Sequence, residues 1–235
     1  MNSYRNNAIA AGVLFIIATG VDILSLQFLG PMNATNYLVS VSANAGLVAT
    51  GALLLFIGGA AATGVAISLY PVLRKYNGGL ALGAVGFRTF EGVLRFVAVC
   101  GLLLLITLSQ QFVKAGAPDS SYFQTLGAVF LSGHDWVGFG AGPIAFSLGG
   151  LMYYIIFYQT KLVPRWLSIW GLVGVTLCAT SAMLVMFNII GTFSTVQIVL
   201  NFPFIFAQEL VLAVWLIVKG FNPSVIASKS PQVDS

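Results

Sequence analysis

The feature that most constrains this chain is a series of six apolar runs, each long enough to cross a membrane as a helix. Crossing about 30 Å of hydrocarbon takes about 20 helical residues, and the helix satisfies its own backbone hydrogen bonds there. We place the predicted spans at residues 8–29, 45–70, 80–109, 137–158, 166–190 and 201–218. Charged residues make up 7% of the chain, against about 25% in soluble domains. The sequence therefore predicts an all-α, polytopic membrane protein, a bundle of six transmembrane helices.

The lysines and arginines between these runs predict the orientation of the bundle. Short cytoplasmic segments collect Lys and Arg, whereas exported segments do not. If the amino terminus lies inside, the outer segments hold only Lys114. The inner segments then hold Arg5, Arg74, Lys75, Lys161, Arg165, Lys219 and Lys229. We therefore expect both termini to be cytoplasmic.

The chain has room for one membrane domain and a short tail. Residues 1–220 contain all six runs, and no hydrophilic stretch is long enough for a second domain. Residues 221–235 are polar and are expected to form a disordered cytoplasmic tail. The net charge of +4 is spread between apolar runs, which argues against a nucleic-acid partner. The expected partner is the lipid bilayer, and the oligomeric state stays open.

Small residues form two faces that predict close helix packing. They are GGAAATG at 58–64, in the second run, and LGG at 148–150, in the fourth. Small side chains let two helix backbones approach each other within a membrane. We expect these faces to serve helix packing and nothing more.

Three charged residues lie inside the third run, in the stretch FRTFEGVLRF at 87–96. Arg88, Glu91 and Arg95 are spaced i, i+3 and i+7, which places them on one stripe of a helix with Glu91 in reach of both arginines. By the helical rise they straddle the middle of the bilayer. A charge in contact with lipid there costs at least about 2.5–3.5 kcal/mol. The stripe is therefore expected to face other helices or a wet cavity.

Acidic residues from other runs are expected to join this stripe. Asp22, Asp135 and Glu209 bring the number of carboxyl groups to four, against two arginines, so one carboxyl is expected to hold a proton. The leading hypothesis is a buried site that binds or passes a small polar or anionic ligand or a proton. Arg88 and Arg95 would bind the anionic ligand, and Glu91 and Glu209 would be exchangeable partners in this site. The predicted ligand-binding residues are Asp22, Arg88, Glu91, Arg95, His134, Asp135 and Glu209.

The pair His134–Asp135 supports two different placements. Asp135 is a plausible N-cap for a helix that starts at Trp136, near the outer interface. Alternatively, GAGP at 140–143 breaks the helix and the preceding segment dips inward, bringing His134 toward Glu91 or Glu209.

Two further hypotheses compete with the ligand site. One is an intramembrane enzyme that uses His134 and Asp135 with the carboxylates. His134 is the only histidine, so zinc motifs that need two are excluded, and no metal site is predicted. The other is a non-catalytic accessory subunit in which the charges only lock helices together. The sequence assigns no catalytic residue and no cofactor, and we lean against an enzyme.

Dispersed motifs resemble one known family. They are Arg88 with Glu91-Gly92, His134-Asp135, LVPRWLSIWGLVG at 162–174, and Glu209 followed by WLIVKGF at 215–221. In this order they resemble the bacterial family described as domain of unknown function 4386. The resemblance implies a multi-pass protein of the bacterial inner membrane with no known activity. It also implies that Arg88, Glu91, His134, Pro164, Arg165 and Glu209 occupy motif positions.

Overall fold

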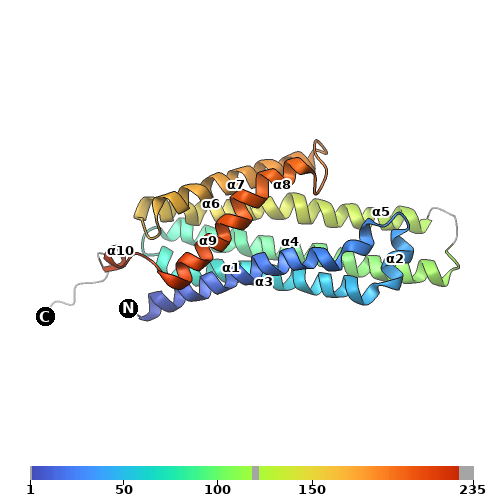
Figure 1. Ribbon diagram of the computed structural model, residues 1–235, viewed down its shortest axis with the longest axis horizontal. Helices are drawn as coiled ribbons and strands as arrows, with labels where there is room; N and C mark the ends of the chain where they lie inside the picture. The colour runs from blue at the N-terminus through green and yellow to red at the C-terminus, as the bar shows by residue number, and fades with distance from the viewer. Residues whose placement is uncertain (1, 118–121, 228–235) are drawn as a thin grey trace.

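The computed structural model describes residues 2–117 and 122–227 of the chain, and within them every regular element is helical (Figure 1). In chain order these elements are α1 (Asn2–Phe28), η1 (Gly30–Asn33), α2 (Tyr37–Ala43), α3 (Ala45–Leu73), α4 (Gly78–Lys114), α5 (Tyr122–Asp135), η2 (Trp136–Ala141), α6 (Gly142–Thr160), α7 (Arg165–Met186), α8 (Thr195–Asn201), η3 (Phe202–Phe206), α9 (Ala207–Val218) and α10 (Pro223–Ala227). Among them, η2 and η3 are π-helical.

Six helical segments in the described residues are long and apolar enough to cross a membrane, which confirms the predicted fold class. Four correspond to α1, α3, α4 and α7. The fourth span is Tyr122–Thr160, in which α5, η2 and α6 follow each other without interruption, and the sixth is Thr195–Val218, made of α8, η3 and α9. The chain is therefore an integral membrane protein that crosses the bilayer several times.

Two predictions about the fourth span are wrong. Asp135 has helical backbone angles and its side chain makes no capping hydrogen bond, so α5 continues directly into η2 and no separate helix starts at Trp136. The sequence GAGP also does not break the helix. In η2 the N–H of Gly142 donates to the carbonyl of Val137, five residues back, and this wider turn accommodates Pro143, which has no N–H to donate. Pro203 lies in the second π-helical segment, η3.

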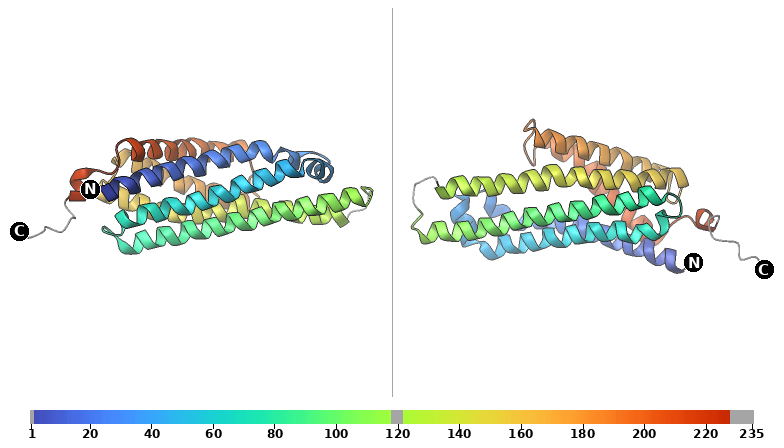
Figure 2. Two further views of the ribbon diagram at one scale, coloured as in Figure 1. Left: turned by 90° about the horizontal axis from the view of Figure 1, so that it is seen from below. Right: turned by 180° about the vertical axis from the view of Figure 1, so that it is seen from behind.

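The helices pack in two regions. Around α4 lie α3 and α6, while α1 packs against α3 and α9, and α7 packs against α6. The larger core joins these helices at the end where the chain begins. A second core, with Leu38 and Val41 of α2 against Leu105 and Phe112 of α4, lies at the other end. There α4 and α5 extend beyond α7, as both views in Figure 2 show.

Most of the described basic residues lie at one end of the bundle, together with the start of α1 and the end of α9. The first residues of α1 lie beside the end of α9 (Figure 1), where the Arg5 guanidinium donates to the carbonyls of Leu216 and Ile217 at 3.2 and 2.5 Å. Arg74, Lys161 and Lys219 are the C-cap residues of α3, α6 and α9, and Arg165 begins α7. We call this the basic end.

The tail prediction falls largely outside the described residues. Residues 223–227 form the short helix α10, and residues 228–235 are not described. The disorder and the cytoplasmic side of the tail stay predictions.

Candidate functional site

The charged stripe of α4 is an ion-pair ladder inside the bundle. Arg88 Nη1 lies 2.9 Å from Glu91 Oε2, and Arg95 Nε donates to Glu91 Oε1 at 3.1 Å. The side chains of Arg88 and Glu91 are 2% and 1% exposed. Counted from Gly78, these residues lie about 15–25 Å from the basic end, close to the middle of a 30 Å hydrocarbon layer. Glu91 thus pairs with both arginines, as the spacing i, i+3 and i+7 predicts.

Asp22 extends the ladder from α4 to α1. Both of its carboxylate oxygens accept hydrogen bonds from Arg95 Nη1, at 2.6 and 2.7 Å. This pair is less buried than the rest of the ladder, since the Arg95 and Asp22 side chains are 25% and 20% exposed. The ladder therefore runs from a partly exposed pair to a fully buried one.

Glycines of α3 and α6 make room for the two arginines. A Cβ on Gly58 would lie 2.6 Å from Asp22 Oδ1, and a Cβ on Gly59 would lie 3.2 Å from Arg95 Cδ. A Cβ on Gly149 would lie 2.9 Å from Arg88 Cγ. These small faces were expected only to let helices approach each other. They also accommodate the arginine side chains, which the sequence pattern did not indicate.

Arg88 is held by α3 and α6 as well as by Glu91. Its Nε donates to the carbonyl of Ala62 at 3.3 Å, and its guanidinium carbon lies 4.6 Å from the centre of the Phe146 ring. Thr63 of α3 donates its hydroxyl to the carbonyl of Arg88 at 3.1 Å. Three helices therefore fix the position of this cation.

Glu209 of α9 lies in the same buried region. Its Oε2 accepts a hydrogen bond from the Thr19 hydroxyl of α1 at 3.1 Å, and its carboxyl group lies within electrostatic range of Arg88. The whole residue is 6% exposed. Counted from the end of α9, it lies about 15 Å deep, at the level of Arg88. We call Asp22, Arg88, Glu91, Arg95 and Glu209 the polar cluster.

Several buried polar atoms around Arg88 make no hydrogen bond. They include Arg88 Nη1, Glu91 Oε2, the Tyr153 hydroxyl and Glu209 Oε1. The short distance between Arg88 Nη1 and Glu91 Oε2 is therefore an ion pair without hydrogen-bond geometry. Arg88 lies within electrostatic range of the other three groups. An unsatisfied buried polar atom costs about 1–3 kcal/mol, and folded proteins leave few of them, commonly at chemically active sites or where water or an ion binds.

His134 and Asp135 are not part of the polar cluster. His134 Nδ1 lies 3.4 Å from the carbonyl oxygen of Ala98, which is seven residues beyond Glu91 and so about 10 Å further along α4. Among the described His, Cys, Asp and Glu side chains, no three come together as a metal ion would require.

Sequence reasoning missed the neutral partners of the polar cluster. Thr19, Thr63, Phe146 and Tyr153 all contact its charges or border them. One signal was available for Thr19, which lies three residues before Asp22 and so shares its face of α1. The others are brought close only by helix packing.

The chain was compared with protein families, with curated proteins and with solved structures. The family model for domain of unknown function 4386 matches residues 10–220. The comparisons with curated proteins and with solved structures gave no match. The match covers most of the first span, the other five spans in full and every residue of the polar cluster. The chain therefore belongs to the family defined by domain of unknown function 4386.

Proposed function

We propose that this membrane protein binds and exchanges a proton at Glu209, within the polar cluster. The observation that carries the proposal is the unpartnered oxygen Oε1 of this buried carboxyl group. Within the described residues, its side chain accepts one hydrogen bond, from Thr19, and forms no salt bridge with a cation.

The charge balance of the polar cluster supports this assignment. Asp22 and Glu91 offset the two arginines in direct ion pairs. Glu209 would then add one uncompensated negative charge near the bilayer centre. An uncompensated charge there costs at least about 2.5–3.5 kcal/mol, and a bound proton removes that cost. When Glu209 releases the proton, Arg88, which lies within electrostatic range, would stabilise the carboxylate.

A proton fits the geometry better than an anion held by both arginines. The Nε and Nη1 of Arg95 already donate to Glu91 and Asp22. An anion would have to displace these carboxylates. The partial exposure of Asp22 and Arg95 supports a route by which protons reach the buried end of the cluster.

The proposal predicts a proton signal that depends on Glu209. In reconstituted protein, infrared titration across about pH 4–9 should show a carboxylic-acid C=O band that Glu209→Gln removes. Asp135→Asn is the matched control, because Asp135 lies outside the cluster, and it should leave that band in place. A band that survives in Glu209→Gln, or that disappears in Asp135→Asn instead, would contradict the assignment.

A structural charge lock is the second candidate function. The chain of ion pairs from Asp22 to Arg88 joins α1 to α4, and Ala62 and Thr63 tie it to α3. If locking is its whole role, replacing Arg88 and Glu91 together by a neutral pair of similar volume should leave abundance and cell phenotype normal. A lost phenotype at normal abundance would instead favour the proton site.

We also propose that the basic end faces the cytoplasm of a bacterial inner membrane. This rests on the preference of cytoplasmic segments for Lys and Arg. Green fluorescent protein fused after Ser235 should then fluoresce, and alkaline phosphatase fused there should be inactive. The opposite pair of results would reverse the orientation.

A further inference from the structure

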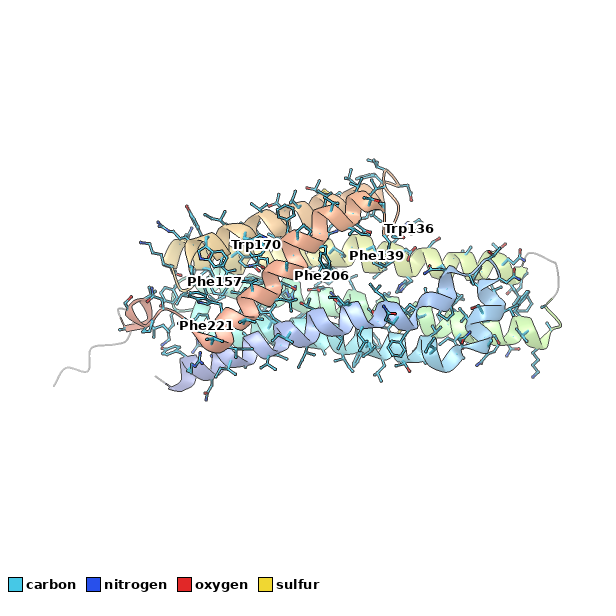
Figure 3. All side chains as sticks on the ribbon, in the orientation of Figure 1. Trp136, Phe139, Phe157, Trp170, Phe206 and Phe221 are labelled. Atoms are coloured by element: carbon cyan, nitrogen blue, oxygen red, sulfur yellow. The ribbon has the colours of Figure 1, made fainter. Side chains whose placement is uncertain are left out.

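A cavity of about 580 Å³ lies at the basic end, between the turn that joins α6 to α7 and the turn that follows α9. Its walls include Lys161, Pro164, Arg165, Trp215, Lys219 and Phe221. Phe221 packs against Phe157 with ring centroids 6.3 Å apart, and both lie toward the end where the chain begins (Figure 3). The cavity is thus built by the ends of three spans, separately from the polar cluster.

The three cations of this cavity have no acidic partner in the described residues. The described carboxyl side chains are Asp22, Glu91, Asp135 and Glu209, and all belong to the spans rather than to the basic end. Arg165 stacks over the Tyr158 ring at 5.4 Å, which orients its guanidinium without neutralising it. Among the described residues, the positive charge of the cavity is therefore uncompensated.

The amino end of α7 strengthens this positive potential. The first residue of α7, Arg165, lines the cavity, and the amino end of a helix carries free N–H groups and a partial positive charge. The carbonyl end of α9 would repel an anion. Its carbonyls at Leu216 and Ile217 instead accept hydrogen bonds from Arg5. The amino end of α7 thus favours a negative ligand, and Arg5 offsets the negative end of α9.

Tryptophans place the cavity at the level of lipid headgroups. Trp166 and Trp170 follow Arg165 on α7 and stack with ring centroids 6.3 Å apart, and Trp166 is 52% exposed. Tryptophans concentrate where the hydrocarbon meets the headgroups. Trp215 and Phe221 add apolar walls to the same cavity. A ligand in the cavity would contact both cationic side chains and apolar rings.

We infer that this cavity binds the phosphate group of an anionic lipid headgroup. Arg165 supplies a planar fork that matches phosphate oxygens, while Lys161 and Lys219 act as point charges. The apolar walls would contact the glycerol and the first acyl carbons. Basic pockets between transmembrane helices suit this chemistry. A free phosphate would use the same donors but would not use the apolar walls.

The test compares lipid retention by native mass spectrometry and affinity by tryptophan fluorescence. The full chain is presented with dioleoylphosphatidylglycerol, with dioleoylphosphatidylcholine and with inorganic phosphate. We expect retention of phosphatidylglycerol alone. The variant Arg165→Gln/Lys219→Gln should weaken its affinity about 10- to 30-fold, since each cation near an anionic headgroup contributes on the order of a fivefold factor.

Matched variants separate a built site from general attraction. Arg74→Gln/Lys75→Gln removes the same charge at the basic end, outside the cavity, and should change the affinity less than threefold. Arg165→Lys/Lys219→Arg keeps the charge and should retain most of the binding even if the glutamine variant folds poorly. Equal losses in the two glutamine variants would overturn the site. Saturable binding of inorganic phosphate that depends on Arg165, without lipid retention, would overturn the lipid as its source.

Discussion

Replacing Arg88 with glutamine is expected to lower the free energy of unfolding by about 3–5 kcal/mol, because it leaves Glu91 deep in the bundle with one cation instead of two. Arg88 is 2% exposed and is surrounded by Ala62, Phe146 and Gly149. Neither water nor lipid headgroups can compensate the lost charge there. Unfolding in mixed detergent micelles, followed by circular dichroism, measures the change.

Two variants test whether the charge itself is responsible. Arg74→Gln removes an exposed arginine at the end of α3 and should change the free energy of unfolding by no more than about 0.5 kcal/mol. Combining Arg88→Gln with Glu91→Gln removes both partners and should cost less than Arg88→Gln alone. A loss below about 1 kcal/mol in Arg88→Gln would mean that the ion pair is not needed for folding.

Replacing Gly174 with alanine is expected to destabilise the bundle by about 3 kcal/mol, at the upper end of the usual range for overpacking. A Cβ on Gly174 would lie 2.2 Å from the carbonyl oxygen of Phe204 and 2.9 Å from Ile205 Cδ1. The obstacle is backbone of η3, which cannot rotate away as a side chain can. Alanine would therefore push η3 away from α7. Because η3 leads directly into α9, this movement should also displace Glu209 and weaken its carboxylic-acid C=O band.

Gly86→Ala is the control for this prediction. Gly86 is exposed on α4, and a Cβ there meets nothing within 4 Å. Alanine should therefore leave stability unchanged or raise it by up to about 1 kcal/mol, as expected for a helix interior. If Gly174→Ala behaved like Gly86→Ala, the close approach of α7 and η3 would not exist in the membrane.

Local patterns predicted much of this fold, since they depend on neighbours in the chain. A run of about 20 apolar residues has one stable form in hydrocarbon, so the six spans could be read directly. The ladder of Arg88, Glu91 and Arg95 depends on helical geometry alone, and the structure contains both ion pairs of Glu91, with Arg88 and with Arg95. The π-turn at η2 was missed because GAGP resembles a helix breaker. Only the continuing backbone shows that a wider turn accommodates the proline.

The sequence by itself determined the membrane-spanning class, the number of spans and the pairing within α4, because hydrophobicity and helical rise act over a few turns. The tertiary structure decided which groups share the buried region. Thr19 meets Glu209 across 190 positions of the chain, and Arg95 meets Asp22 across 73. It also separated His134 and Asp135 from the polar cluster. Such contacts depend on how whole helices pack, and no spacing within one helix specifies them.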